Sequence, residues 1–448
     1  MRLDQVTDEV LEDVIPDDDE RDRLRDVFEN VRRRAREAID ERGIDADVEL
    51  VGSAARDTWI SGDRDIDVFL LLPDDLPRDD LEETGLDVGK QVFPDGVVEY
   101  AEHPYVKGHD RGYDIDLVPC YDVESATEAK TAVDRTPFHN RYVSERLEDT
   151  DDARLLKSFT KGIGVYGSEL RTRGFSGYLC ELLVLHYGGF EEAIEAASDW
   201  SPQVTIDIED HGTKEFDDPL VVVDPTDPER NVAAVLSLDN FARFVHACRR
   251  LSAEPRKSLF FESNPGTVSR EELEKYIEDR QTTVVCVTFE SPDVVEDQLY
   301  PQLRKTESSL VDEVERRGFE VLRSDVAADD RGLILLELNI AEQSRVERHL
   351  GPPVHVRQHA ESFRSKYADA DVVGPYIDDG RYVVERERDY PTVASFVESD
   401  DFLDIGMGKH VEEKIHEGYD VYVDDDCTRL VEEFGSVFAT HISPEVVE

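Results

Sequence analysis

The sequence predicts an α+β protein made of several domains. With 448 residues, the chain exceeds the usual size of one domain, which is about 100–200 residues. Its apolar pattern also changes along the chain: one long helix is followed by short strands, then by a mainly helical stretch, and then by a β-α-β-β series. We therefore expect domains at residues 1–142, 143–263 and 264–448.

The first domain opens with a predicted amphipathic helix over residues 18–41. Apolar residues recur every three to four positions from Leu24 to Ile39, while Asp17 is a suitable N-cap and Gly43 a suitable stop. The pattern then changes to the alternation typical of β-strands, in the runs 47–51, 65–72, 97–106 and 113–121. One helix followed by strands indicates an α+β domain.

The middle of the chain is predicted to be helical. Helices are expected within 155–167 and 177–188, where Ser176 is a suitable N-cap, and another helix should follow Asp239. Residues 219–231 indicate a short strand that runs into a proline-broken turn. These segments predict a second, helical domain.

The last domain is predicted to contain a small split βαβ (RRM-like) body. The expected order is strand, helix, strand, strand, at residues 282–289, 293–317, 319–324 and 333–340. Residues 350–448 alternate glycine and proline breaks with amphipathic pieces and are expected to form a tail.

The net charge is strongly negative. The chain has 105 acidic and 51 basic residues, a formal charge of −54, and most of the basic residues are arginine. A carboxylate-rich, lysine-poor surface suits a protein that stays soluble in concentrated salt, where self-repulsion is screened. We therefore expect a halophilic protein. Because nucleic-acid contacts weaken steeply with salt, any nucleic-acid site has to be a local basic groove.

Cysteine usage and hydropathy predict a cytoplasmic protein. The five cysteines are odd in number, widely spaced and mostly set in apolar runs, as buried thiols in a reducing compartment would be. The N-terminus is charged and no apolar run reaches about 18 residues, so we expect neither a signal peptide nor a membrane span.

The run from Val51 to Leu70 contains the first catalytic pattern. A strand enters a Gly-Ser turn, and the next strand carries Asp65 and Asp67, which alternation places on one face. Burying this pair would cost several kcal/mol, at about 1.36 kcal/mol per pKa unit, unless a cation is bound. Magnesium prefers carboxylate oxygens combined with substrate phosphates, so the pair indicates half of a magnesium site for a nucleoside triphosphate.

A second strand, 113–121, repeats the pattern with Asp114 and Asp116 on one face. Alternation alone does not rank these two residues. If the strand lies beside 65–72, one of them completes a two-metal clamp for phosphoryl-group transfer. An isolated D-x-D means little in so acidic a chain, so the joint pattern carries the prediction. No G-x-x-x-x-G-K-[ST] and no strand-linked G-x-G-x-x-G occurs, which disfavours kinases and dehydrogenases.

The turn before the first D-x-D suits a phosphate group. Gly52 allows close approach of the backbone, and Ser53 offers a hydroxyl and an amide near the start of a short helix. Arg56 can add positive charge there.

These segments resemble a known family. GSAARDTWISGDRDIDVFLLL and YDIDLVPCY are similar to the catalytic signature of the class I, archaeal-type CCA-adding enzymes, which are tRNA nucleotidyltransferases of the polymerase-beta-like superfamily. TPFHN at 136–140, residues 155–188 and DPTDPERNVAAVLS at 224–237 resemble the family's nucleotide-pocket and central-domain segments. The resemblance implies a polymerase-beta-like nucleotidyltransferase head. Together with the acidic, lysine-poor composition, it indicates a haloarchaeal member of the family.

The resemblance also implies roles for single residues. Asp65, Asp67 and Asp116 would form the catalytic, metal-binding triad, which selects Asp116 where alternation could not. Ser53 and Arg56, beside Gly52, would hold the triphosphate. The matches to positions that contact the incoming nucleotide are His139, Lys157 and Tyr166, and Arg230 matches the arginine implicated in base selection.

The function implied is addition or repair of the CCA end at the tRNA 3′ terminus, from CTP and ATP and without a nucleic-acid template. The primer hydroxyl attacks the α-phosphate, two magnesium ions assist, and pyrophosphate leaves. The resemblance further implies that the C-terminal body and tail bind the acceptor arm of tRNA, largely by its shape, and that the protein is a homodimer.

Two alternatives remain at this point. A poly(A) polymerase or oligoadenylate synthetase would share the triad but accept ATP alone, and the central and C-terminal segments disfavour it. A non-catalytic RNA-binding protein of the same fold is disfavoured by three intact aspartates, because a relic has no reason to keep their mutual repulsion.

Overall fold

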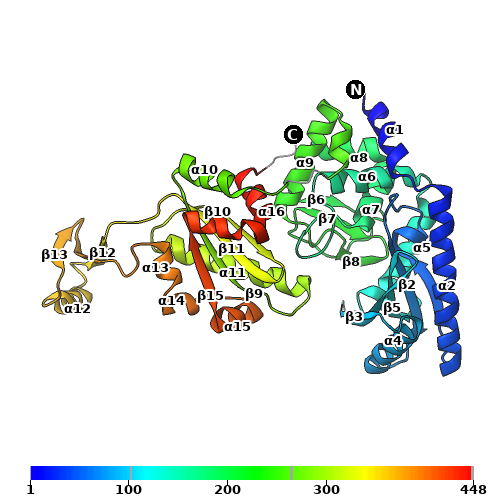
Figure 1. The fold of residues 1–448 in the computed structure, drawn as a ribbon, viewed down its shortest axis with the longest axis horizontal. Coiled ribbons are helices and arrows are strands. Elements are labelled where there is room, and N and C mark those ends of the chain that lie inside the picture. Colours follow the sequence, from blue (N-terminus) through cyan, green and yellow to red (C-terminus); the bar gives the residue numbers. More distant parts are fainter. Residues whose placement is uncertain (1, 101–102, 263–265, 445–448) are drawn as a thin grey trace. The chain divides into compact units, whose positions relative to one another are not determined.

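The computed structural model describes residues 2–100, 103–262 and 266–444. The chain separates into two compact units that meet in sequence at residues 264 and 265 (Figure 1). The division of the chain into three domains, with a boundary at 142/143, stays a prediction.

The first unit contains a five-stranded sheet in the order β1-β2-β5-β4-β3. Only β2 and β5 run parallel, and the other neighbours are antiparallel. Helices α2 and α4 pack on one face of this sheet, against Val68, Val106 and Leu117. The bounds are α2 Asp18–Arg42, β1 Asp47–Val51, β2 Asp65–Pro73, α4 Arg78–Val92, β3 Val97–Tyr100, β4 Pro104–Asp110 and β5 Tyr113–Asp122.

Most local predictions for this sheet are confirmed, including both caps of α2. The Asp17 carboxylate accepts a hydrogen bond from the Glu20 amide, and Gly43 ends the helix with φ 66°. The single strand predicted over 97–106 is wrong. Tyr100 pairs with Pro104, so the segment is a hairpin of β3 and β4. A reversal of direction inside a run of strand-forming residues leaves their alternation intact, and the pattern therefore did not reveal it.

The rest of the first unit is mainly helical, as predicted. Its core gathers around Phe159, Phe190 and Phe244, and the Ser176 hydroxyl caps α7 by accepting a hydrogen bond from the Leu179 amide. A small sheet of order β6-β7-β8 lies beside the helices. The bounds are α1 Leu3–Val14, α5 Thr136–Arg146, α6 Thr150–Gly162, α7 Gly177–Tyr187, α8 Phe190–Ser198, β6 Val204–Ile206, β7 Leu220–Asp224, β8 Asp227–Asn231 and α9 Leu238–Ala253.

The second unit contains the predicted β-α-β-β series as β9, α11, β10 and β11. Its sheet has the order β10-β11-β9-β15, so a fourth strand from near the end of the chain, which was not predicted, completes it. One apolar core lies between this sheet and α11, and another between the sheet, α10 and α16. The bounds are α10 Arg270–Arg280, β9 Thr283–Glu290, α11 Glu296–Arg316, β10 Val321–Ala328, β11 Arg331–Leu338, β15 Tyr419–Val423 and α16 Val431–Ile442.

The predicted tail region forms a second, smaller sheet of order β12-β14-β13. Helix α12 packs on it through Phe363 and Tyr367, whose rings lie 5.9 and 6.0 Å from that of His349. The bounds are β12 Val346–Pro353, α12 Arg357–Tyr367, β13 Val373–Asp378, β14 Arg381–Glu387, α13 Val393–Val397, α14 Asp400–Leu403 and α15 Lys409–Glu417. Within the described ranges, no helix has the length and apolar character needed to cross a membrane.

Candidate active site

Two adjacent parallel strands present four aspartates on one face of the first sheet. Strand β2 pairs with β5 so that Asp65 lies opposite Asp114 and Asp67 lies opposite Asp116. Residues in register on parallel strands point their side chains the same way, and residues two apart on a strand share a face. The expectation that the two D-x-D strands are neighbours is therefore confirmed. This face is opposite to the one that α2 and α4 cover.

Strand β4 supplies one basic partner to each of the two in-register pairs, Asp65/Asp114 and Asp67/Asp116. His109 Nδ1 lies 3.0 Å from Asp114 Oδ1, whereas Lys107 Nζ is 4.0 Å from Asp116 Oδ1. The Asp116 Oδ1 atom is buried and has no hydrogen-bond partner. A buried acceptor without a hydrogen-bond partner is costly, and a cation bound at this oxygen would remove that cost. The two aspartates that alternation could not rank thus differ in their partners, and the choice of Asp116 as a metal ligand stays a prediction.

Burial disfavours the charged forms of both central carboxylates. It raises the pKa of Asp67, with Arg56 opposing and Asp65 adding to the rise. It also raises the pKa of Asp116 to about 6, where the charge of Lys107 opposes and that of Asp67 adds to the shift. A bound divalent cation would favour ionisation of both groups.

The fit of this site to a metal ion rests on two features: the donors are carboxylate oxygens, and the aspartates that carry them share one face of the sheet. Hard carboxylate oxygens are what magnesium prefers, and one of them is buried without a partner. In the part of the chain that the structure describes, no three His, Cys, Asp or Glu side chains already converge as a closed ligand set. Asp65, Asp67 and Asp116 thus share a face without meeting at one point, and their metal role stays a prediction.

The raised pKa of Asp116 predicts a pH-dependent difference in stability. The folded protein favours the neutral acid, so the stability linked to this group is present below pH 3.8 and is lost as the pH rises through about 6. In EDTA, Asp116→Asn should match the wild type near pH 4 and exceed it above pH 7 by about 1–3 kcal/mol in the free energy of unfolding. Urea unfolding at several pH values measures this; a difference independent of pH would contradict it.

The Gly-Ser turn lies directly against the aspartates. Strand β1 ends at Val51, and the short helix α3 (Gly52–Ala55) follows it. Gly52 has φ 72°, and a Cβ atom placed on it would lie 2.2 Å from Asp67 Oδ2. The positive φ therefore favours glycine here, and a larger residue would also have to displace the Asp67 carboxylate. Ser53 is the next residue, so the predicted phosphate seat adjoins Asp67.

Arg56 and Lys157 share one buried acidic partner, which the sequence did not reveal. Glu181 Oε2 lies 2.8 Å from Arg56 Nε, and Glu181 Oε1 lies 2.7 Å from Lys157 Nζ. Although burial opposes ionisation of Glu181, the two cations hold its pKa below the ordinary value. The available signal was a single glutamate in the apolar helix run 177–188.

Lys157 is less accessible than its predicted role requires. Its side chain is 2 % exposed, and Nζ donates to Thr58 O, to Thr58 Oγ1 at 2.7 Å and to Glu181 Oε1. All three ammonium hydrogens therefore have protein acceptors. Lys161 Nζ likewise lies 2.9 Å from Asp63 Oδ1. In this structure both lysines hold the loop before β2, and a nucleotide contact by Lys157 stays a prediction.

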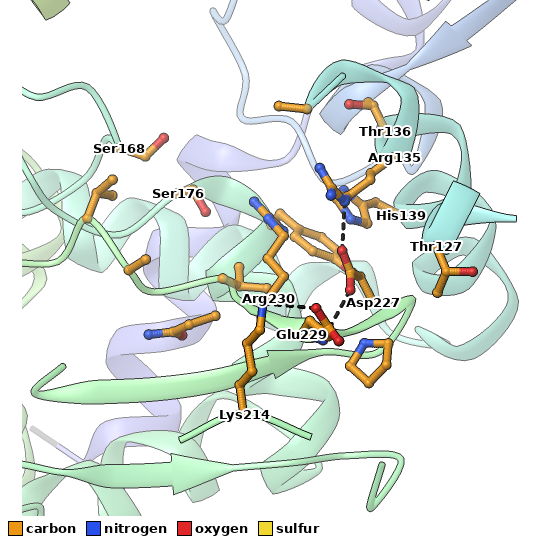
Figure 2. A pocket seen from close by; sticks show the side chains of 17 residues that line it. Thr127, Arg135, Thr136, His139, Ser168, Ser176, Lys214, Asp227, Glu229 and Arg230 are labelled. Carbon is orange, nitrogen blue, oxygen red and sulfur yellow. Dashed lines mark hydrogen bonds and ion pairs between the residues drawn. The ribbon is translucent and has the colours of Figure 1, made fainter. Parts of the chain in front are cut away.

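A pocket of about 990 Å³ is lined by segments that include parts of α5, α7 and β8 (Figure 2). His139 and Arg230 both line it, as does Tyr178, whose ring stacks on His139 with centroids 4.2 Å apart. The buried Asp224 orients two of them: its Oδ2 lies 2.8 Å from His139 Nε2 and 2.7 Å from Arg230 Nη1. A flat aromatic stack beside a fixed guanidinium suits a nucleobase with its phosphates.

Asp224 and Tyr178 were missed by the sequence analysis. Burial opposes ionisation of Asp224, but the hydrogen bond from His139 and the charge of Arg230 lower its pKa below the ordinary value. Its signal was an aspartate ending the buried run LVVVD. Burial also lowers the pKa of His139, which favours the neutral imidazole.

The predicted nucleotide residues thus fall into two groups. Of these residues, His139 and Arg230 line the pocket, and the other five do not. Tyr166 is partly buried, with Lys161 Nζ 5.2 Å from its ring centre. Arg56 links the groups, because its charge contributes to the pKa values of both Asp67 and His139.

Comparisons with known proteins identify the family. Residues 32–139 match the model of a nucleotidyltransferase domain, 151–261 that of the second domain of tRNA nucleotidyltransferase, and 280–424 that of the C-terminal domain of CCA-adding enzyme. The CCA-adding enzyme of Haloarcula marismortui is 52 % identical to this chain, over 99 % of each. The chain belongs to the CCA-adding enzyme family. The CCA-adding enzymes of Halorubrum lacusprofundi and Methanosarcina barkeri are 50 % and 43 % identical, over 97 % and 94 % of each chain.

Family membership agrees with the geometry of the site. In this member of the CCA-adding enzyme family, the nucleotidyltransferase segment contains all four strand aspartates, and the second-domain segment contains Tyr178, Asp224 and Arg230. The solved structure of a cytoplasmic RNA terminal U-transferase is 14 % identical, with a TM-score of 0.44, and covers 58 % of this chain and 98 % of its own. A likeness so distant supports no argument about function.

Proposed function

We propose that this protein adds or repairs the CCA end at the 3′ terminus of tRNA, using CTP and ATP and no nucleic-acid template. The observation that carries the proposal is the register of β2 and β5, which sets Asp67 beside Asp116 next to the Gly52 turn. Family membership supplies the substrate class. Asp65, Asp67 and Asp116 would hold magnesium.

The reaction is a nucleotidyl transfer. The tRNA 3′-hydroxyl oxygen forms a bond to the α-phosphorus, the bond from that phosphorus to the bridging oxygen breaks, pyrophosphate leaves, and the hydroxyl proton passes to water. Magnesium, when bound, lowers the pKa of the hydroxyl and neutralises the triphosphate. The chain itself positions the reactants: Gly52 and Ser53 would seat the phosphates, and the His139–Tyr178 stack would support the base.

Arg230 is predicted to act on nucleotide binding. Its side chain is 38 % exposed and lines the pocket, and its guanidinium is held by Asp224. Arg230→Gln should raise the KM for nucleotide by about 10-fold, which corresponds to about 1.4 kcal/mol, and should alter the ratio of CTP to ATP use. Steady-state kinetics with each nucleotide measures this, with the exposed Arg33→Gln as the control. An unchanged KM for both nucleotides would contradict the role.

The second unit is proposed to bind tRNA, and the surface charge to keep the protein soluble at high salt. The body and tail would bind the acceptor arm of tRNA, and the protein would act in the cytoplasm as a homodimer. The charge of −54 supports adaptation to high salt. The scarcity of lysine means that arginine, which binds phosphate in a bidentate way, would make most of the tRNA contacts.

The decisive experiment uses tRNA transcripts that end at the discriminator base, at C and at CC. Each is incubated with labelled CTP and ATP, magnesium and high potassium chloride. Ordered addition of C, C and A supports the proposal. Polyadenylation of unrelated RNA would indicate a poly(A) polymerase instead, and no incorporation would indicate a non-catalytic RNA-binding protein.

A further inference from the structure

A short loop joins the two catalytic parts of the first unit. Residues 57–64, here named the site loop, connect α3 to β2 and so separate the Gly-Ser turn from Asp65 and Asp67. Three basic residues on one face of α6 bind this loop: Arg154, and the two lysines described above. The spacing of three and four residues places them in line along the helix.

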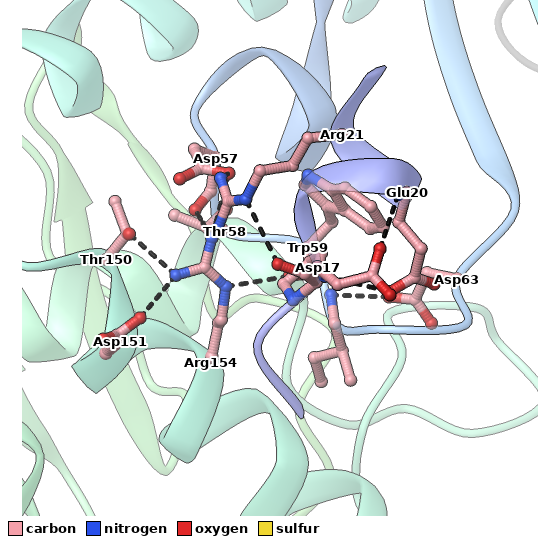
Figure 3. Close-up of polar contacts among 12 residues, drawn as sticks. Asp17, Glu20, Arg21, Asp57, Thr58, Trp59, Asp63, Thr150, Asp151 and Arg154 are labelled. Carbon is pink, nitrogen blue, oxygen red and sulfur yellow. Dashed lines mark hydrogen bonds and ion pairs between the residues drawn. The ribbon is translucent and has the colours of Figure 1, made fainter. Parts of the chain in front are cut away.

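Arg154 makes the largest number of these contacts, although its side chain is only 1 % exposed. Its Nε donates to Trp59 O at 3.0 Å, and its Nη2 donates to Asp57 O and lies 3.0 Å from Asp57 Oδ1 (Figure 3). Its Nη1 donates to Thr150 Oγ1 at 2.8 Å and to Asp151 Oδ1 at 2.6 Å. Four hydrogen bonds and an ion pair with Asp57 therefore hold the guanidinium, and two of the hydrogen-bond acceptors are loop carbonyls.

The loop is also held from its other side and contains a strained residue. Asp57 has φ 52°, a left-handed conformation that non-glycine residues adopt rarely, and its carboxylate pairs with Arg21 as well as with Arg154. Glu20 accepts hydrogen bonds from Ser61 Oγ at 2.9 Å and from the Gly62 amide at 3.1 Å. Such backbone conformations persist where the surroundings determine them from several directions.

We propose that Arg154 is a positioning residue for nucleotidyl transfer, whose buried guanidinium fixes the site loop and thereby the spacing between the Gly-Ser turn and the aspartates of β2. The inference rests on the proposed function for its effect on rate, but its effect on the loop is independent of it. Arg154 does not line the nucleotide pocket. Its loss therefore acts on the geometry of the reaction and leaves the residues that line the pocket in place.

The test compares Arg154→Met and Arg154→Lys with the wild type. A displacement of about 1 Å at a reacting centre can cost roughly 100-fold in rate, so we expect kcat to fall about 10–100-fold while the KM for ATP stays within about 3-fold. Arg154→Lys should recover little of the lost kcat, because a lysine ammonium cannot donate to both Asp57 O and Trp59 O as the planar guanidinium does.

Chemical rescue gives a second measurement. Guanidinium chloride at low millimolar concentration should restore part of kcat to Arg154→Ala but none to Asp67→Asn. Arg33→Met, at 59 % exposure, is the matched control.

Hydrogen exchange tests the loop itself, whatever the enzyme's substrate is. Arg154→Met should speed exchange in peptides that cover 57–64 and leave those covering 219–231 unchanged. If this variant does not fold, Asp57→Asn replaces it. Asparagine tolerates the left-handed conformation, so only the ionic contact with the arginines is lost. Faster exchange at 57–64 and a lower kcat are then expected, both smaller than for Arg154→Met. Unchanged exchange at 57–64, or a raised KM with normal kcat, would overturn the inference. A wild type that adds no C, C and A would instead reject the proposed function alone.

Discussion

Replacing Asp67 with asparagine is expected to lower the rate of CMP and AMP addition to tRNA by roughly 10³-fold or more. Asp67 lies between Gly52 and Asp116, where its carboxylate would hold a metal ion that stabilises the transition state. Removing one such ligand forfeits several kcal/mol, and each 1.36 kcal/mol corresponds to about tenfold in rate. Single-turnover incorporation of labelled nucleotide measures the loss.

Stability should not fall with this substitution. Because burial raises the pKa of Asp67, its charge is unfavourable in the folded protein at neutral pH, and a neutral amide of the same shape removes that penalty. Asp65→Ala and Asp116→Asn should lose activity to a similar extent. Asp114→Asn is the matched control, since Asp114 shares the same sheet face but is bound by His109. Equal losses at Asp114 and Asp67, or a nearly normal Asp67→Asn enzyme, would show that the metal site is misplaced.

The second large effect concerns stability and is expected for Glu181→Gln. Glu181 has no exposed side-chain surface and neutralises both Arg56 and Lys157. Removing its charge leaves two buried cations without their acidic partner, and breaking a buried ion pair in this way costs about 3–5 kcal/mol. Urea unfolding followed by tryptophan fluorescence measures the change in this unit alone, because both tryptophans, Trp59 and Trp200, belong to it.

A double variant tests whether the destabilisation comes from the unpaired cations. Lys157→Met combined with Glu181→Gln should be less destabilised than the sum of the two single variants, because one orphaned cation is gone. Glu37→Gln removes a surface partner of Arg33 and should cost less than about 1 kcal/mol. A Glu181→Gln protein as stable as the Glu37→Gln protein would contradict the account.

Local chemistry allowed much of the fold to be predicted. The caps of α2 and α7, the strands that became β1, β2 and β5, and the β-α-β-β order of the second unit follow from patterns within about 20 residues. The hairpin of β3 and β4 and the strand β15 were not predicted. Whether a strand reverses, and which sheet it joins, depends on partners far away in the chain.

The sequence by itself determined which side chains share a face. The two-residue period of a strand places Asp65 with Asp67 and Asp114 with Asp116, and the Gly-Ser turn marks the segment before them. Only the tertiary structure decided what each group contacts. His109 contacts Asp114, an oxygen of Asp116 has no hydrogen-bond partner and lies 4.0 Å from Lys107 Nζ, and Glu181 pairs with Lys157. Backbone periodicity is a local property, whereas charge pairing and burial depend on how separate elements pack: Lys157 bonds both Glu181 and Thr58, and Thr58 lies 99 positions away in the sequence. No local pattern encodes such contacts.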